Sequence, residues 1–309
     1  MIEATSLAER KPFDRLLAAI VGVEKSGKSR LCATAETPVL VHDFDGRADA
    51  LAGKPNVYSL TYRDVGGFNQ PEAFTDFLNI LSQLELFKND LSKIIINGLP
   101  AFPLVPPETF VKSNVLDSIQ WMAKAAMRYN LYSGGGIKGF ARNMTIGQTT
   151  VRFPGGFDSW NAEMAALEEC ILRVFALKTH VLVTLHEQAE EAPGSTAEKP
   201  VFTGRVNIFP ARYQRLLGLF NEVWRVSRGV STDGKASGSV PVVKTTPTYD
   251  FAYGASAMLL DAEEQPNIHA MIAKHLARET SLHEVTGLAT QATSVPPVTQ
   301  AIATQLNKY

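Results

Sequence analysis

The 309-residue chain has only two cysteines, Cys32 and Cys170. Two thiols exclude both the disulfide framework of a small secreted domain and the cysteine cluster of a structural zinc site. Because both lie in apolar, helix-compatible segments, we expect them to be buried core thiols. The segment Met1–Asp14 lacks the apolar stretch of a signal peptide, and no apolar run approaches the roughly 18 residues of a membrane span. We therefore expect a cytoplasmic protein with no membrane partner.

An excess of charge of either sign is also missing. The chain has 30 Lys and Arg against 31 Asp and Glu, for a net charge of −1. This balance excludes a basic overall footprint for nucleic acid, although a local basic patch remains compatible with it. Hydrophobic residues make up 45% and charged residues 20%, as in ordinary globular proteins. The length suits one large α/β domain or two small domains.

The most informative motif that is present is Gly22–Ser29, which reads GVEKSGKS and matches the phosphate-loop pattern G-x-x-x-x-G-K-[S/T]. An apolar run at 16–21 precedes it, and a helix-compatible run at 29–35 follows it. In such a loop, backbone N–H groups and a helix N-terminus bind phosphate oxygens. Lys28 then contacts the β- and γ-phosphates, and the hydroxyl of Ser29 ligates Mg²⁺. The alternative interpretation is a glycine turn beside a solvated lysine.

We therefore predict a site for a nucleoside triphosphate. Its expected nucleotide-binding residues are Gly22, Val23, Glu24, Lys25, Ser26, Gly27, Lys28, Ser29 and Arg30.

Along the rest of the chain, short apolar strands alternate with amphipathic helices, which predicts a mostly parallel sheet flanked by helices. A hairpin is expected near the C-terminus. We expect one domain at residues 14–279, followed by a weakly ordered tail at 280–309. Two long segments, 133–157 and 187–205, are interpreted as functional or disordered loops. The expected strands are 16–21, 39–42, 94–96 and 181–185; the expected helices are 71–87, 114–131, 160–177, 211–220 and 266–278; the expected hairpin pairs 223–230 with 240–245.

Polar residues follow the predicted strands, and ligands bind beyond the carboxyl ends of strands in open parallel sheets. Asp43 and Asp45 are one residue apart, so an extended backbone points both side chains to the same side. One of them can act as a base toward water while the other supports Mg²⁺. The alternative interpretation is a solvated end of the strand.

Two further strand ends carry candidate residues. Asn97 stands where a metal-supporting aspartate is expected; its amide can bind Mg²⁺ through a water but brings no negative charge. Alternatively, Asn97 and Gly98 simply form a turn. His186 can donate a hydrogen bond to the γ-phosphate and report it to the loop that follows, or it is a structural histidine.

As a set, these residues resemble the RecA-like P-loop ATPases of phages, in particular those grouped with Sak-type single-strand annealing recombinases. The resemblance implies an α/β, RecA-like P-loop NTPase core with a C-terminal β-hairpin region, ATP and Mg²⁺ as ligands, homo-oligomeric rings or filaments, and the cytoplasm of a host cell. The matching segments are Gly22–Ser29, Asp43–Gly46, the strand ending at Asn97, Thr184–Glu187, Arg205–Val226 and Lys244–Asp261.

The resemblance also assigns roles. It implies that Lys28, Asp45 and His186 form the catalytic set, with Asp45 as the base toward water and His186 as the γ-phosphate sensor. Mg²⁺ is expected at Ser29 and Asp43, and at Asn97 through water. Because Asn97 replaces the usual aspartate of the family, efficient ATP turnover is in question.

The leading hypothesis is an ATPase that acts on single-stranded DNA in recombination or annealing. Its DNA contacts are expected in the two long loops, where arginine and lysine bind phosphates and phenylalanines stack on bases. One alternative is a nucleotide-binding switch or oligomerisation module with little hydrolysis, and another is a small-molecule phosphotransferase with a closing lid. The expected DNA contacts are Lys138, Arg142, Arg152 and Arg205, with Phe140, Phe153 or Phe157 as stacking residues.

Overall fold

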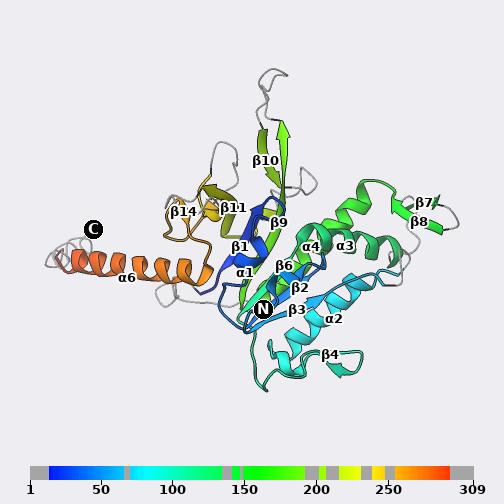
Figure 1. Ribbon diagram of the computed structural model, residues 1–309, viewed down its shortest axis with the longest axis horizontal. Coiled ribbons are helices and arrows are strands. Elements are labelled where there is room, and N and C mark those ends of the chain that lie inside the picture. The colour runs from blue at the N-terminus through cyan, green and yellow to red at the C-terminus, as the bar shows by residue number, and fades with distance from the viewer. Residues whose placement is uncertain are drawn as a thin grey trace, which may run out of the picture.

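The chain forms one mostly parallel β-sheet with helices on both faces (Figure 1). The fold is known from a computed structural model, whose description covers residues 14–65, 70–133, 141–146, 149–191, 202–206, 216–230, 239–247 and 255–292. The main sheet has ten strands in the order β14-β12-β11-β1-β9-β6-β2-β3, with β10 beside β9 and β13 beside β11. Neighbouring strands from β11 to β3 are parallel, whereas β10, β12, β13 and β14 pair antiparallel.

The strands of the main sheet are β1 (Leu17–Gly22), β2 (Val39–Asp43), β3 (Val57–Thr61), β6 (Ser113–Asp117), β9 (His180–Glu191), β10 (Phe202–Val206), β11 (Glu222–Val230), β12 (Ser239–Lys244), β13 (Ala255–Ser256) and β14 (Glu263–Glu264). Two small antiparallel sheets join β4 (Ile95–Ile96) to β5 (Leu99–Pro100), and β7 (Ala141–Ile146) to β8 (Thr149–Pro154). The α-helices are α1 (Lys28–Cys32), α2 (Glu72–Leu86), α3 (Ile119–Ser133), α4 (Phe157–Ala176) and α6 (Ile268–Ala292), and the 3₁₀ helices are η1 (Ala48–Leu51) and η2 (Leu91–Lys93).

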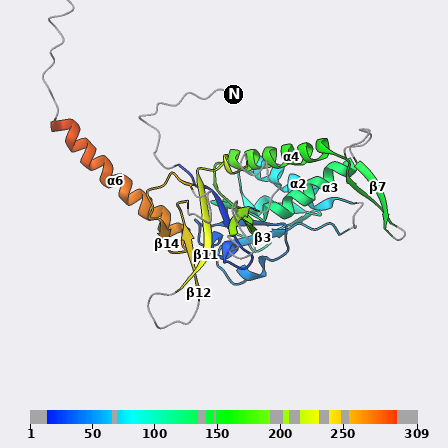
Figure 2. The same cartoon turned by 90° about the horizontal axis from the view of Figure 1, so that it is seen from above.

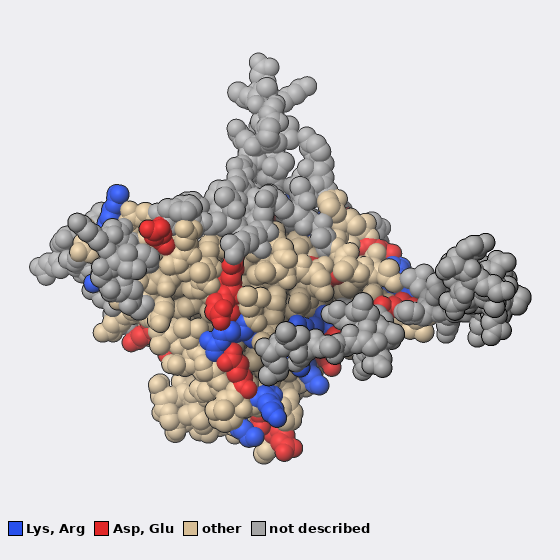
Figure 3. Space-filling view, turned by 180° about the vertical axis from the view of Figure 1, so that it is seen from behind, with Lys and Arg blue, Asp and Glu red and all other residues tan. Residues whose placement is uncertain are grey.

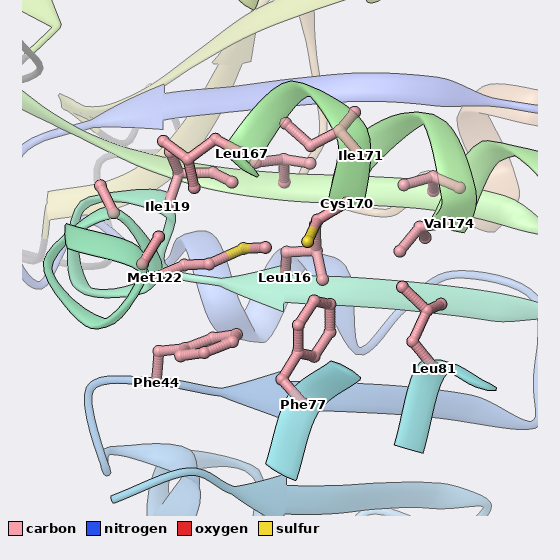
Figure 4. Close-up of a cluster of buried hydrophobic side chains, with 14 of the residues drawn as sticks. Phe44, Phe77, Leu81, Leu116, Ile119, Met122, Leu167, Cys170, Ile171 and Val174 are labelled. Carbon is pink, nitrogen blue, oxygen red and sulfur yellow. The ribbon is translucent and has the colours of Figure 1, made fainter. Parts of the chain in front are cut away.

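Alternate residues of the central strands pack into two hydrophobic cores, one on each face of the sheet. In β1, Ala19 and Val21 face the core made with α2, α3 and α4, whereas Ala18 and Ile20 face the core made with α1 and the start of α6. Figure 2 shows α2, α3 and α4 together on one side of the sheet, and Figure 4 shows their side chains packing over β6 and β2. The sheet is therefore buried on both faces, as parallel sheets generally are.

Several predictions from the sequence are confirmed. Helices α2 and α4 match the expected 71–87 and 160–177, and β11 pairs with β12 as the expected hairpin. Cys32 and Cys170 are buried free thiols, one in each core.

A separate finding concerns helix length and composition: none of the described helices is long and apolar enough to cross a membrane.

The prediction of a helix over 114–131 is wrong at its start. Ser113–Asp117 forms β6, and the helix α3 begins only at Ile119. All five residues of β6 are buried, because β9 and β2 flank the strand and helices cover its faces. The polar side chain of Asn114 is satisfied there: its Oδ1 pairs with Nε2 of His42, and its Nδ2 donates to Oγ1 of Thr179.

The prediction of a sheet strand at 94–96 is also wrong. Ile95 and Ile96 belong to the small β4–β5 hairpin, with about 40% of each side chain exposed (41% and 40%). Asn97 and Gly98 both have positive φ angles, 51° and 79°, as the central residues of a tight hairpin turn require. The turn interpretation of Asn97 is therefore the one that the fold bears out.

Other segments are more regular than expected. Residues 133–157 contain the β7–β8 hairpin, and residues 187–205 contain the outer part of β9 and most of β10. Helix α6 continues to Ala292, past the expected end at 278. Strand β3 was not predicted, and residues 211–215 of the expected helix at 211–220 lie outside the described residues.

Candidate functional site

The carboxyl ends of β1, β9, β6 and β2 meet at one edge of the sheet and enclose a cavity of about 370 Å³. This is the edge at which parallel α/β sheets bind ligands. The cavity is lined by Lys25, Gly27, Lys28, Ser29, Arg30, Asp45, Arg47, Ala50, Asp117 and His186. Of the nine predicted nucleotide-binding residues, the lining includes Lys25, Gly27, Lys28, Ser29 and Arg30, while Gly22, Val23, Glu24 and Ser26 belong to the same loop without lining the cavity.

The phosphate loop, Gly22–Ser29, connects β1 to α1 and folds around the ammonium group of Lys28. The Nζ atom of Lys28 donates hydrogen bonds of 2.8 Å to the carbonyl oxygens of Gly22 and Val23. Lys28 is buried, which lowers its pKa, and the negative charge of Asp117 partly offsets this effect. A buried cation is thus held where an anionic ligand can reach it.

Two glycines shape the loop for different reasons. Gly27 has a φ of 102°, a conformation that glycine adopts without strain. Gly22 is needed for space, because a Cβ atom there would lie 2.5 Å from the carbonyl oxygen of Val226 and 2.7 Å from Oγ of Ser26. Strand β11 therefore approaches the start of the loop too closely for any side chain at position 22.

Asp117, at the end of β6, is the acidic residue beside the phosphate loop. Its Oδ2 accepts a 2.6 Å hydrogen bond from Oγ of Ser29, and its Oδ1 accepts one from Oγ1 of Thr184 on β9. The carboxylate is buried, so these charge-assisted bonds hold both hydroxyls firmly in place. Ser29 and Asp117 thus place two oxygen-bearing side chains on one side of the cavity.

Asp43 does not have the metal-supporting position expected of it. Its carboxylate is 1% exposed and accepts hydrogen bonds from the backbone N–H groups of Gly46 (2.8 Å), Arg47 (3.3 Å) and Ala48 (3.1 Å), and from Oγ1 of Thr61 (3.3 Å). Asp43 therefore shapes the turn after β2 and does not line the cavity. That turn brings Asp45 and Arg47 to the cavity wall.

Asp45 is half-buried in the cavity wall. Burial raises its pKa to about 7, and the negative charge of Asp117 and the hydrogen bond and charge of Asp43 add to the increase, whereas the N–H of Arg47 opposes it. A carboxyl group with a pKa near neutrality is suited to accept a proton from water.

His186 lies beside the phosphate loop, where it is the register partner of Gly22 between β9 and β1. Its carbonyl oxygen accepts a 3.2 Å hydrogen bond from Nε2 of Gln120 on α3. Burial lowers the pKa of His186, and so does the charge of Lys28. Its Nδ1 is buried without a hydrogen-bond partner among the described residues, and the residue lines the cavity.

Asn97 lies in the turn between β4 and β5, in a sheet separate from the main one, and it is not among the residues that line the cavity. The structure therefore does not bring Asn97 to this cavity, and the acidic residue beside Ser29 is Asp117. The missing signal was the short run Ser113–Asp117, which has the length of a strand and ends in an acid. The helical pattern that follows it concealed the strand.

The expected DNA-contact residues fall into three groups. Arg142 is exposed on β7, opposite Phe153 on β8. Arg152 instead packs the hairpin onto α3: its Nη1 donates to the carbonyl of Leu131 (3.0 Å), and its guanidinium lies 5.2 Å from the ring centre of Tyr132. Lys138 and Phe140 lie outside the described residues, whereas Phe157 is the first residue of α4 and Arg205 belongs to β10, with only the backbone of these two described.

Charged side chains of both signs alternate on the face seen in Figure 3, and the coloured residues there form no broad area of one sign. The described residues therefore provide no extended basic surface on this face.

No protein-family model matches the chain, and no curated protein sequence matches it either. The cavity must therefore be interpreted from its own residues.

Proposed function

We propose that this chain binds ATP with Mg²⁺ on a RecA-like P-loop core and hydrolyses it. The observation that carries the proposal is the 2.6 Å contact between the phosphate-loop hydroxyl of Ser29 and the buried carboxylate of Asp117. A P-loop NTPase requires a hydroxyl and an acid at this point, because together they orient Mg²⁺ and its waters beside the phosphates. Ser29 belongs to α1 and Asp117 to β6, 88 residues further along the chain, so the sequence motif alone does not produce the contact.

The oxygen ligands fit Mg²⁺. Within the described part of the chain, no group of three or more His, Cys, Asp or Glu side chains could hold a metal ion. Mg²⁺ does not need such a cage, since it keeps several waters and takes one or two protein oxygens plus substrate phosphates. Ser29 would ligate the ion, and Asp117 would hold one of its waters. The ion would neutralise charge that develops on the phosphates.

The protein groups then have separate tasks. Lys28 binds phosphate oxygens in place of the two loop carbonyls that its ammonium group now contacts. Asp45 accepts a proton from the water that attacks the γ-phosphorus, as the O–P bond to ADP breaks and inorganic phosphate leaves. His186 donates a hydrogen bond to a γ-phosphate oxygen. Because Asp45 has a pKa of about 7, it is partly ionised and able to act as a base at neutral pH.

The non-hydrolysing switch has lost its main support. That alternative rested on Asn97 in place of an acid and on the near-neutral net charge, and Asp117 supplies an acid beside Ser29. The residues that line the cavity therefore give no specific reason to expect slow ATP hydrolysis. The phosphotransferase alternative has no distinct support among the residues that line the cavity.

We further propose that the ligand coupled to ATP is single-stranded DNA, bound by the β7–β8 hairpin. Arg142 and Phe153 are directly opposite each other across this hairpin, and both are exposed. Opposite residues of an antiparallel pair share a face. A guanidinium beside an aromatic ring can bind a phosphate and stack on a base at the same time. The resemblance also makes a homo-oligomer the expected assembly.

The test is steady-state ATP hydrolysis with Mg²⁺, measured with and without single-stranded DNA. Lys28→Ala removes the phosphate-binding cation and should abolish both nucleotide binding and turnover. Lys54→Ala is the matched control, since it removes an exposed lysine that does not line the cavity. Wild-type protein that binds no ATP, or Lys28→Ala protein that binds it normally, would overturn the proposal.

The DNA part has its own test. Arg142→Ala should weaken binding of a single-stranded oligonucleotide, and wild-type affinity should fall as salt rises, because phosphate contacts release counterions. Lys54→Ala again removes one positive charge elsewhere. Equal affinities for both variants, or binding that is independent of salt, would count against DNA as the ligand.

A further inference from the structure

Strand β9 changes partners immediately after His186. It pairs with β1 up to the register pair of Gly22 and His186, and with β6 up to Leu116 and Val183. From Glu187 to Glu191 its partner is β10 instead. Glu187 is thus the first residue of a two-stranded ribbon, the β9–β10 ribbon, that extends from the sheet beside the phosphate loop (Figure 1).

A buried ion pair holds the base of this ribbon. Arg225 on β11 donates to both carboxylate oxygens of Glu187, with Nη2 2.5 Å from Oε1 and Nε 3.0 Å from Oε2. The two side chains are only 14% and 4% exposed. A planar two-point contact of this kind fixes orientation as well as distance.

The ion pair spans the strand that leads into the phosphate loop. Arg225 is the register partner of Val21 on one side of β1, and β9 lies on the other side. The side chains of Glu187 and Arg225 therefore join the two neighbours of β1 at the point where β1 becomes the loop. His186, the residue proposed to contact the γ-phosphate, is adjacent to Glu187 in the chain.

We propose that the Glu187–Arg225 ion pair is a positioning contact that couples the phosphate loop to the β9–β10 ribbon. This inference rests on the proposed nucleotide site. A ligand that contacts His186 must shift or stiffen the main chain at 186–187, and the ion pair prevents the ribbon from relaxing independently of β11. Stability alone does not account for such a pair, because apolar residues of similar volume commonly stabilise a core as well or better.

The measurement is hydrogen exchange of the backbone amides at 187–191 and 202–206, with and without a non-hydrolysable ATP analogue and Mg²⁺. In wild-type protein the analogue should slow exchange by about 5-fold or more, the lower end of typical coupling between sites. In the double variant Glu187→Gln/Arg225→Gln, that slowing should disappear. Affinity for the analogue should change by less than about 3-fold, since neither residue lines the cavity.

Two further variants keep the outcome clear. The double variant leaves no unpaired buried charge, and the exchanged pair Glu187→Arg/Arg225→Glu should restore part of the nucleotide-dependent slowing. Arg173→Gln is the matched control, because Arg173 makes a similar two-point contact with Glu85 between α4 and α2 (2.8 and 2.7 Å). It should leave the slowing at 187–191 and 202–206 unchanged.

The possible failures can be told apart. If wild-type protein does not bind the analogue, the proposed nucleotide site is wrong. If it binds the analogue but exchange in the ribbon does not change, or if the double variant retains the full slowing, the site stands and the coupling role of the ion pair is overturned.

Discussion

Asp117→Asn is the sharpest perturbation of the proposed site, and Asn97→Asp is its natural counterpart. The first removes the negative charge beside Ser29, and the second adds a carboxylate in the β4–β5 turn. If the site is built as proposed, the first should nearly stop ATP turnover and the second should leave it unchanged. If Asn97 had the metal-supporting role instead, Asn97→Asp should strongly increase ATP turnover.

The magnitudes follow from the contacts. Asp117 accepts hydrogen bonds from the hydroxyls of Ser29 and Thr184; an amide oxygen can keep one of them, and the other hydroxyl must rotate. Loss of the charge should remove about 3 kcal/mol of transition-state stabilisation, comparable to loss of one preorganised polar contact. At 1.36 kcal/mol per factor of ten, turnover falls about 10²-fold. Asn97 has a φ of 51°, which aspartate also tolerates, so the free energy of unfolding should change by about 0.5 kcal/mol or less.

The assay is phosphate release under saturating Mg²⁺ and ATP, with urea unfolding to verify that both variants are folded. Asp117→Asn should lose turnover while remaining folded, because removal of its charge also relieves repulsion with Asp45. Normal turnover in Asp117→Asn, or a large gain in Asn97→Asp, would refute the assignment of Asp117.

Three further predictions concern the fold around the site. Glu222→Ala should lower the free energy of unfolding by about 3 to 5 kcal/mol, because the buried carboxylate accepts four hydrogen bonds, from an indole, a hydroxyl and two backbone N–H groups. Gly22→Ala should cost about 1 to 3 kcal/mol and weaken ATP binding, since its Cβ would lie 2.5 Å from a carbonyl oxygen of β11. Burial lowers the pKa of His42 from 6.5 to about 4, so the unfolded chain binds the proton more readily, and stability should fall by up to about 3 kcal/mol as pH decreases from 6.5 to 4.

Urea unfolding measures all three, and each has an outcome that contradicts it. A change below about 1 kcal/mol in Glu222→Ala would mean that its hydrogen-bond network does not contribute as expected. Gly156→Ala is the control for Gly22→Ala, because nothing lies within 4 Å of the added Cβ; equal effects of the two would exclude the steric explanation. His42→Gln should flatten the dependence of stability on pH, whereas the exposed His269→Gln should not; equal curves for both would contradict the role of His42.

Some helices could be predicted from the sequence because their pattern depends on residues that are close together in the chain. Helices α2 and α4 were predicted nearly to their ends, since their apolar residues recur at helical spacing over several turns. Strand β6 was missed because five residues carry too little pattern, and only burial between β9 and β2 makes them a strand. The prediction of a main-sheet strand at 94–96 was wrong for a different reason. An apolar triplet is compatible with such a strand, but Asn97 and Gly98 directly after it favour a tight hairpin turn.

The sequence by itself determined the phosphate loop, because a strand, a glycine turn and a helix start depend on consecutive residues and on the backbone freedom of Gly27. Tertiary structure alone decided which acid meets Ser29, since Asp117 is 88 residues away and reaches it only through the order of the strands. It also decided that Asp43 shapes a turn, and that Arg225 and Glu187 meet beside β1. The position of a carboxylate in the chain does not reveal its role, because its pKa and its partners both depend on the groups that the fold brings to it.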